Sequence, residues 1–283
     1  MRLPELMDDV EALANEAADA ACEIYEENFD VEFKKDDQDS PLTEADLEAN
    51  RIITAGLQEL TPEIPIISEE SEDNLDYDVR KDFDRFWLVD PLDGTREFVN
   101  KNDEFTVNIG LIEHGVPIAG VVVAPVPDVT YRTDGINTIV RRNGQTSDLR
   151  VSDVSDLSKS TLMCSRSHRR PPLQELIEGN EFGNVTPKGS SLKLCNVAEG
   201  KSDVYCRFGP TWEWDTAAAD AILRMSGGKI TEPDGNNLVY NTESLKNDRG
   251  FVVTNSLLHD EIVEEMSAII GEPEGIEKNA QTS

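Results

Sequence analysis

The sequence predicts a mixed α+β / α/β fold in which two sub-domains share one cleft. Two amphipathic helices come first, because apolar residues recur every three or four positions over residues 6–28 and 49–60. A hairpin-rich sheet follows up to about Val151, and short strands then alternate with helices. The predicted sub-domains are residues 1–155 and 156–270, and residues 271–283 form a flexible tail.

The start of the second helix is the best defined boundary in the first half. Residues 30–41 are charged and end in Ser-Pro, which indicates a loop. Thr43 then opens the helix, with Asp46 at the position of a capping box. Thr61-Pro62 ends it, because proline disfavours helical geometry in the residue before it.

Apolar runs bounded by turn residues predict the strands. Residues 64–68 and 86–90 are short apolar strands, and the second runs into the turn PLDGT. Residues 105–112 and 116–126 flank Glu113-His114-Gly115, which predicts a hairpin. In the second half, strands are predicted over 161–165, 203–208 and 251–254, and helices over 190–200, 214–228 and a last stretch ending near 270.

The composition limits the possible partners. The chain has 283 residues and a formal net charge of −31, which argues against nucleic acid or an anionic membrane as a partner. We find no apolar run long enough to span a bilayer, and the start MRLPELMDD does not resemble a signal peptide. The four cysteines are far apart, which is typical of reduced thiols, so we expect a cytoplasmic protein. The charge favours a monomer only slightly over a homodimer.

The acid excess is concentrated near the N-terminus. Residues 1–50 contain 17 Asp or Glu against Arg2, Lys34 and Lys35. Either the surface is adapted to high salt, or this segment is a disordered acidic tail. The helical periodicity favours the halophilic interpretation.

The stretch WLVDPLDGTREF contains the strongest chemical signal. A buried strand would deliver Asp90, and Asp93 follows in the same turn, so both carboxylates and the Leu92 carbonyl could face one point. Hard oxygen ligands from a tight turn suit Mg²⁺. The amides of Gly94 and Thr95 could then hold a phosphate. A capped turn without chemistry is the alternative interpretation of these residues.

Two further acidic positions make the metal interpretation stronger. Glu69 and Glu70 follow an apolar strand, and Asp215 begins an apolar helix in WEWDTAA. Each alone could be a surface acid or a helix cap. Three such positions together favour a shared metal site.

These motifs resemble a known superfamily. ISEES, WLVDPLDGT and EWDTAAADAI stand in the order and spacing of the lithium-sensitive, magnesium-dependent phosphatases that include inositol monophosphatases and fructose bisphosphatases. Within it, DSPLTEAD, CSRSH, GSSLKLCNVAEG and DVYCRFGPTWEWDTAA most resemble bacterial 3′(2′),5′-bisphosphate nucleotidases. The resemblance covers residues 5–255 and implies the layered αβαβα sandwich of the inositol monophosphatase / fructose bisphosphatase type.

The resemblance also implies roles for individual residues. It implies two or three Mg²⁺ ions, with Thr95 orienting the attacking water, Glu69 behind it and Asp46 linked to a third metal or to water activation. Amides of Gly94 and Thr95 would hold the phosphate that is cleaved. The implied metal ligands are Glu69, Asp90, the Leu92 carbonyl, Asp93 and Asp215. The implied substrate-binding residues are Asp93, Gly94, Thr95, Ser190, Ser191, Lys193 and Asp215.

Charged residues outside these motifs affect which phosphate ester the protein would bind. Lys193, Arg207 and the cluster Arg166/Arg169/Arg170 are the candidates to meet a 5′-phosphate. For the arginine cluster, solvent-exposed side chains without a partner are the alternative interpretation. One departure from the family pattern is Trp212-Glu213, which would put an extra carboxylate beside a phosphate-binding cleft.

The resulting functional hypothesis is hydrolysis of the 3′-phosphate of adenosine 3′,5′-bisphosphate to AMP and phosphate by metal-activated water. Inositol monophosphatase or fructose 1,6-bisphosphatase activity is the alternative on the same metal centre. A different class is a non-enzymatic acidic cation binder, since Asp37, Asp39 and Glu48 match positions of an EF-hand loop, although Leu42 replaces its glycine.

Overall fold

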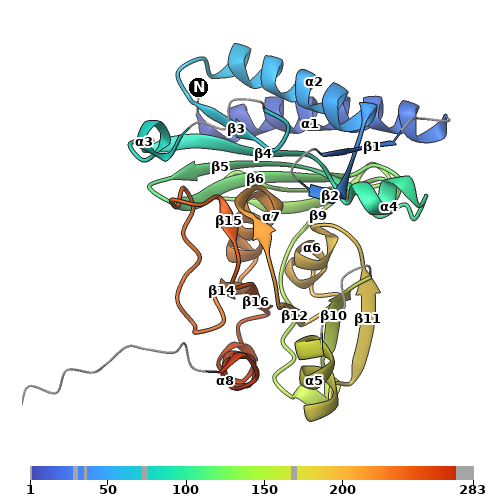
Figure 1. The fold of residues 1–283 in the computed structure, drawn as a ribbon, viewed down its shortest axis with the longest axis vertical. Coiled ribbons are helices and arrows are strands. Elements are labelled where there is room, and N and C mark those ends of the chain that lie inside the picture. The colour runs from blue at the N-terminus through green and yellow to red at the C-terminus, as the bar shows by residue number, and fades with distance from the viewer. Residues whose placement is uncertain (1, 28–30, 35–36, 72–75, 167–170, 272–283) are drawn as a thin grey trace, which may run out of the picture.

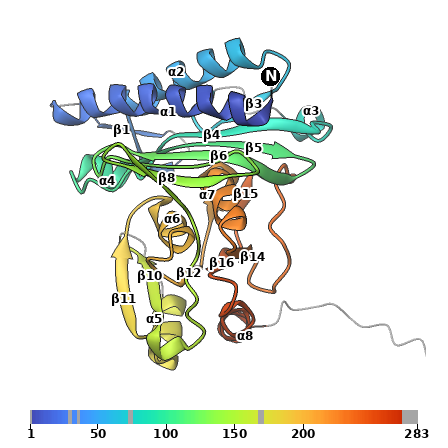
Figure 2. The ribbon, with the colours of Figure 1, turned by 180° about the vertical axis from the view of Figure 1, so that it is seen from behind.

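The protein is a five-layered αβαβα sandwich, as predicted. The structure is a computed structural model. In Figure 1, α1 (Leu3–Glu26) and α2 (Glu44–Leu60) lie above the large sheet, and α6 (Leu192–Ala198) and α7 (Glu213–Met225) lie between it and the smaller sheet. Below the smaller sheet lie α5 (Pro171–Gly179) and α8 (His259–Ile270), and Figure 2 shows the same layers from behind. The structure describes residues 2–27, 31–34, 37–71, 76–166 and 171–271.

The first layer consists of α1 (Leu3–Glu26) and α2 (Glu44–Leu60). Their apolar faces pack together and onto one face of the large sheet, around Val10, Ile53 and Trp87. The predicted capping box is confirmed, because Thr43 N donates to Asp46 Oδ2 at 2.8 Å and Ala45 N donates to Thr43 Oγ1. The alternative of a disordered acidic tail is wrong for residues 3–26, which are helical.

The large sheet has seven strands in the order β3-β4-β5-β6-β7-β8-β9. Strands β3 and β4 are parallel, and every other neighbouring pair is antiparallel. The predicted hairpin joins β5 to β6 through His114 and Gly115, both at positive φ, which matches the twist of the strands. The strands are β3 (Ile66–Ser68), β4 (Arg85–Asp93), β5 (Thr106–Glu113), β6 (Val116–Ala124), β7 (Val129–Thr133), β8 (Thr138–Arg142) and β9 (Gln145–Asp148).

Two local predictions need correction. The segment 30–41 was expected to be a loop, but β1 (Val31–Lys34) pairs with β2 (Asp37–Thr43) as an antiparallel ribbon. The strand ending at Asp90 continues to Asp93, with a bulge in place of the predicted turn. Pro91 has no N–H for the ladder, and Leu92 N donates to Asp90 Oδ1 at 3.1 Å instead of to β5.

The small sheet has five strands in the order β11-β10-β12-β16-β14. Strand β10 is parallel to both of its neighbours, and β16 is antiparallel to both of its own. The predicted strands 161–165 and 251–254 are confirmed. The strands are β10 (Thr161–Ser165), β11 (Asn184–Lys188), β12 (Val204–Arg207), β14 (Lys229–Thr231) and β16 (Phe251–Thr254).

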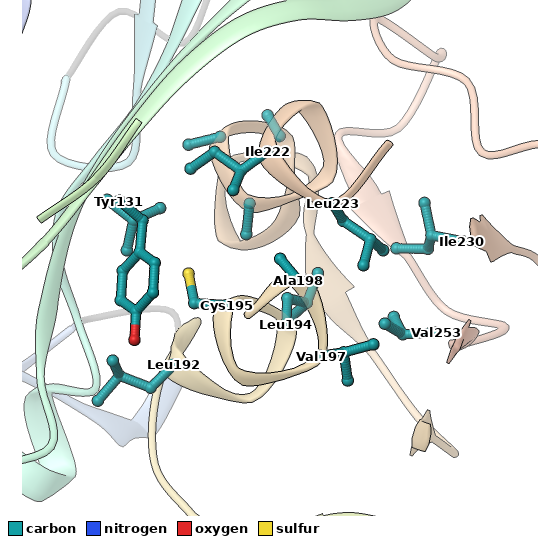
Figure 3. Packing of buried hydrophobic residues seen from close by; sticks show 14 of the residues in the cluster. Tyr131, Leu192, Leu194, Cys195, Val197, Ala198, Ile222, Leu223, Ile230 and Val253 are labelled. Carbon is teal, nitrogen blue, oxygen red and sulfur yellow. The ribbon is translucent and has the colours of Figure 1, made fainter. Parts of the chain in front are cut away.

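Helices α6 (Leu192–Ala198) and α7 (Glu213–Met225) fill the space between the sheets. Figure 3 shows Val197 of α6 and Leu223 of α7 among the apolar side chains that form this core with Val253 of β16. Each fully buried side chain of this size contributes about 1.5–3 kcal/mol. This core fixes both helices between the sheets.

Two glycines let α7 approach the large sheet. Gly110 and Gly120 face each other across β5 and β6. A Cβ at Gly120 would lie 2.5 Å from the Ala218 carbonyl oxygen, and one at Gly110 would lie 2.9 Å from Ala218 N. Because only glycine leaves this space, the sheet holds the first half of α7 at a fixed depth.

The remaining elements are short or peripheral. Below the small sheet, α5 (Pro171–Gly179) packs against α8 (His259–Ile270). The other elements are α3 (Tyr77–Arg80), α4 (Thr95–Val99), a 3₁₀ turn at Leu157–Lys159, and the pair β13 (Thr211–Trp212) and β15 (Lys246–Asn247). Helix α5 and strands β11, β13, β14 and β15 did not appear among the predicted elements.

The sub-domain boundary at 155/156 stays a prediction. Residues 272–283, most of the expected tail, lie outside the described residues. None of the helices in the described ranges is both long and apolar enough to cross a membrane.

Candidate active site

A cavity of about 510 Å³ lies where the carboxyl ends of β3 and β4 meet the amino ends of α6 and α7. Asp46 and Arg166 are absent from its wall, which includes all the implied metal ligands and substrate-binding residues. These residues are Glu69, Asp90, Leu92, Asp93, Gly94, Thr95, Ser190, Ser191, Lys193 and Asp215. Acidic side chains that are distant in the sequence therefore line one cavity.

Asp90 lies at the deepest acidic position. It is 1% exposed, between Val89 and Pro91 on the buried strand β4. Burial raises the pKa of Asp90 well above its usual range, and the charges of Glu69, Asp93 and Asp215 raise it further. Such a carboxylate is unstable as a lone anion in this environment and favours a proton or a cation.

Glu69 reaches the same place because β3 and β4 are parallel. Ser68 is paired with Val89, and Glu69 N continues the ladder to the Val89 carbonyl at 3.1 Å. Parallel strands end at the same edge of a sheet, so Glu69 follows directly beside Asp90, and their carboxyl groups hydrogen-bond. Glu70, the second acid of the pair, is absent from the cavity wall.

Asp93 is held by the start of α6. Its Oδ2 accepts hydrogen bonds from Ser191 N and Ser191 Oγ, both at 2.6 Å. Ser191 Oγ also lies 2.8 Å from the Asp215 carbonyl oxygen, and Asn108 Nδ2 donates to Ser191 Oγ at 3.0 Å. Ser191 was predicted to bind substrate; in the structure it ties the end of β4 to the start of α7.

Asp215 lies in the first turn of α7. Trp212 N donates to its Oδ2 at 2.9 Å, the arrangement of a capping residue. Burial raises the pKa of Asp215 well above its usual range, and Asp93 and Glu69 raise it further. Asp215 therefore shares the electrostatic environment of Asp90, as a common cation site requires.

The donor atoms fit a hard divalent cation. Within the described ranges, no three His, Cys, Asp or Glu side chains already form a metal cage. The carboxylates instead have hydrogen-bond partners: Asp93 accepts from Ser191, Asp215 accepts from the Trp212 amide, and Asp90 bonds to Glu69. Carboxylate and carbonyl oxygens are nevertheless the ligands that Mg²⁺ prefers, and a cation would relieve the repulsion that raises these pKa values.

Thr95 connects the cavity to Asp46. Its Oγ1 lies 3.3 Å from both Asp46 Oδ1 and the Leu92 carbonyl. Asp46 is buried behind Thr95 and caps α2 through its other oxygen. Gly94, at φ +91°, precedes this turn, and a Cβ there would lie 3.1 Å from the Glu104 carbonyl oxygen. The backbone at Gly94 therefore passes close to the segment that leads into β5, which leaves no room for a side chain there.

The part of the cavity lining formed by α6 and β12, here called the cationic wall, carries positive charge. Lys193 is 7% exposed, its Nζ donates to the Ser190 carbonyl, and it lies 5.3 Å from the centre of the Tyr205 ring. Burial lowers the pKa of Lys193, and Asp93 opposes this effect. Arg207 lines the same wall and donates to the Pro210 carbonyl. An anion in the cavity would therefore meet two cationic groups.

The sequence did not predict the ion pairs that Glu104 forms beside this wall. Arg166 forms two hydrogen bonds to the carboxylate of Glu104, at 2.8 and 2.9 Å, and Lys188 lies 3.2 Å from it. Gly189 N also donates to Glu104, which anchors the segment that leads to Ser190. Burial raises the pKa of Glu104, but these partners outweigh it and leave the pKa lowered. Arg166 was predicted as a candidate for a 5′-phosphate; Arg169 and Arg170 lie outside the described residues.

Glu213 does not add charge to the cavity, which corrects the expectation for Trp212-Glu213. Its carboxylate points away and accepts hydrogen bonds from Asn241 N and from Thr242 N and Oγ1. It lines a separate cavity of about 320 Å³. The segment that Glu213 anchors at Asn241 and Thr242 leads to Lys246, which pairs with Trp212. Glu213 therefore supports the wall from behind.

Comparison with known proteins places the chain in a family. A sequence model described as the Inositol monophosphatase family matches residues 5–270. The chain belongs to the inositol monophosphatase family. The superfamily predicted from ISEES, WLVDPLDGT and EWDTAAADAI is therefore confirmed. Enzymes of this family are metal-dependent phosphatases and typically use Mg²⁺.

One curated relative and two solved structures show which members of the family this chain resembles. The chain is 41% identical over 249 residues to the 3′(2′),5′-bisphosphate nucleotidase CysQ of Salmonella typhimurium, with 88% of this chain and 99% of the relative covered. The crystal structure of CysQ from Bacteroides thetaiotaomicron has a TM-score of 0.73 at 35% identity, over 88% of this chain and 96% of that one. The Thermotoga maritima IMPase has a TM-score of 0.78 at 25% identity, over 93% of this chain and 97% of that one.

Proposed function

We propose that this protein hydrolyses the 3′-phosphate of adenosine 3′,5′-bisphosphate to give AMP and phosphate. One observation supports this most directly. A single cavity is lined by the acids Glu69, Asp90, Asp93 and Asp215, here called the acidic wall, and by the cations Lys193 and Arg207 of the cationic wall. A substrate with two phosphates can use both walls. The similarity to bisphosphate nucleotidases over most of the chain supports the same substrate.

Under this proposal, the acidic wall holds two Mg²⁺ ions. The proposed reaction does not require a third ion near Asp46. The proposed ligands are Glu69, Asp90, the Leu92 carbonyl, Asp93 and Asp215. When bound, such ions neutralise phosphate oxygens, lower the pKa of a water and stabilise the leaving oxygen. The protein supplies their position through β4 and the start of α7.

The chain's own groups would handle the nucleophile and the substrate. Thr95 Oγ1, fixed by Asp46, would orient the attacking water, and Glu69 would take its proton. The amides of Gly94 and Thr95 would hold the phosphate that is cleaved. Lys193 would bind the second phosphate, and Ser190 and Ser191 would keep that part of the wall in place.

Two alternative activities use the same acidic wall. Inositol monophosphates and fructose 1,6-bisphosphate differ from the nucleotide in the part that faces Lys193 and Arg207. The test compares kcat/KM for adenosine 3′,5′-bisphosphate, inositol 1-phosphate and fructose 1,6-bisphosphate with Mg²⁺ present. We expect at least about tenfold preference for the nucleotide, which is about 1.4 kcal/mol. A tenfold preference for either alternative would overturn the proposal.

The non-enzymatic alternative is tested by the same assay. Ca²⁺ binding without phosphate release from any of the three esters would support a cation-binding protein. The side chains of Asp37 and Asp39, on which the EF-hand match depends, lie outside the described ones. We also propose a cytoplasmic location, a monomer or homodimer, and inhibition of the phosphatase by lithium.

A further inference from the structure

Trp212 is the accessible aromatic side chain on the cavity wall. Three aromatic side chains line the cavity within the described residues: Tyr205, Trp212 and Phe251. Tyr205 and Phe251 are buried and packed edge to face at 5.5 Å. Trp212 is 41% exposed. A large apolar side chain left open beside a polar cavity needs a functional explanation more than a buried one does.

The surroundings of Trp212 hold its ring in one orientation. The ring stacks on the buried ring of Trp214, with centroids 5.0 Å apart and planes inclined by 7°. Its backbone is fixed by pairing with Lys246 and by the hydrogen bond to Asp215. Since Trp214 covers one face, the exposed area belongs to the rest of the indole. A rigid flat surface is ready before any ligand arrives.

The neighbouring wall also carries polar groups. Thr211, which precedes Trp212, and Lys246, which pairs with it, also line the cavity. In the part of the chain that the structure describes, Thr211 Oγ1 is buried without a hydrogen-bond partner. An open aromatic face bordered by polar groups is the combination that binds planar heterocycles.

We propose that Trp212 is a stacking platform for the base of the nucleotide and that it sets the preference for nucleotides over base-free phosphate esters. This inference depends on the proposed function, because a substrate without a base would have nothing to stack. The acidic wall would act on the phosphate, and Trp212 would discriminate through the base. Stacking on one aromatic side chain corresponds to roughly a 5- to 100-fold effect on affinity.

The experiment compares substrates that differ only in the base. We would measure kcat/KM for adenosine 3′,5′-bisphosphate and for 1-O-methylribose 3,5-bisphosphate, in which a methoxy group replaces adenine. The variants are Trp212→Leu, which keeps apolar bulk without a flat ring, and Trp212→Phe, which keeps a smaller ring. Ile136→Ala is the control, because Ile136 is exposed and absent from the cavity wall. Thermal unfolding checks that each variant folds.

The expected result is a change in the ratio of the kcat/KM values for the two esters. In Trp212→Leu, the preference for the adenine-bearing ester falls about tenfold, mainly through KM, and Trp212→Phe retains most of it. Ile136→Ala leaves the preference at the wild-type value. Calorimetry gives a second readout without turnover: the affinity for AMP relative to 1-O-methylribose 5-phosphate falls by a similar factor in Trp212→Leu.

Three outcomes would overturn the inference. A preference in Trp212→Leu within twofold of wild type means that Trp212 does not contact the base, although the nucleotidase proposal survives. An equal loss of kcat on both esters means that Trp212 acts by supporting Asp215. A wild-type protein that shows no preference for the adenine-bearing ligand in either assay overturns the platform and the proposed substrate together.

Discussion

The two walls of the cavity differ in charge and in how the fold supports them. The acidic wall is built on the bulged end of β4, where Asp90 and Asp93 are close in sequence, with Glu69 beside them on a parallel strand. The cationic wall combines Lys193 of α6 with Arg207 of β12, which belong to separate elements. In the first wall, burial and then repulsion between neighbouring acids raise the pKa values of Asp90 and Asp215.

This difference suggests a division of labour. Repelling carboxylates suit the binding of cations and the chemistry at the reacting phosphate. A cationic wall suits the recognition of a second anion, which remains unchanged in the reaction. Damage to the acidic wall should therefore lower kcat, and damage to the cationic wall should raise KM.

The largest expected effect comes from the acidic wall. Asp90→Asn should lower kcat about 1,000-fold, because it removes the proposed bridging charge. The metal-free variant should unfold at the same temperature as wild type or higher, since the substitution removes a repelled buried carboxylate. Kinetics over a Mg²⁺ titration and thermal unfolding measure both effects.

Asp153→Asn is the matched control, because it makes the same chemical change on an exposed side chain. Turnover in Asp90→Asn with a normal Mg²⁺ dependence would show that the metal site is misplaced.

The second effect concerns the acids on the outer surface and the dependence of the unfolding temperature on salt. The exposed acids of α1, such as Asp9, Glu16 and Asp19, repel one another as those in the cavity do, but solvent ions can screen them. We expect the unfolding midpoint to rise by more than about 10 °C between 0.1 M and 2 M KCl. A flat response would remove the hypothesis of a salt-adapted surface.

The third effect tests the cationic wall. Lys193→Gln should raise KM for adenosine 3′,5′-bisphosphate about tenfold and change kcat little, because it removes one charged contact to the second phosphate. The effect on inositol 1-phosphate, which has one phosphate, should be smaller. Lys159→Gln, at an exposed lysine, is the control. Equal effects on both substrates would contradict the division between the walls.

The smallest effect concerns stability far from both walls. Burial lowers the pKa of His259 to about 4, and Thr231 and Thr254 hydroxyls hydrogen-bond its ring nitrogens. Between pH 4 and 6.5 the unfolded chain binds more protons at this residue, so its contribution to stability falls as the pH falls. The slope is at most about 1.4 kcal/mol per pH unit.

Denaturant unfolding at several pH values, compared with His259→Gln, isolates this contribution. The difference in the free energy of unfolding between the two proteins should shrink as the pH is lowered from 7 to 4.5. A constant difference would mean that His259 is not neutral in the folded protein.

Features of the two walls that depend on neighbouring residues were predictable from the sequence, and features that depend on contacts between distant elements were not. Strands at 161–165 and 251–254 and the cap formed by Thr43 and Asp46 were predictable, because apolar runs and capping residues act within a few positions. The acids of DPLDGT were identifiable for the same reason. The bulge that carries them was not, since it depends on pairing with β5.

The amino-acid sequence by itself determined which residues are chemically equipped for the site and where most of the longer helices and strands lie, but not the ribbon of β1 and β2 or helix α5. Only the tertiary structure decided that Asp215 reaches Asp90, through the approach of α7 to Gly110 and Gly120. It also turned Glu213 away from the cavity, tied Glu104 to Arg166 and joined Ser191 to Asp93. The physical reason is range: propensity and capping act between neighbours, whereas these contacts form between elements that meet only when the sheets and helices pack.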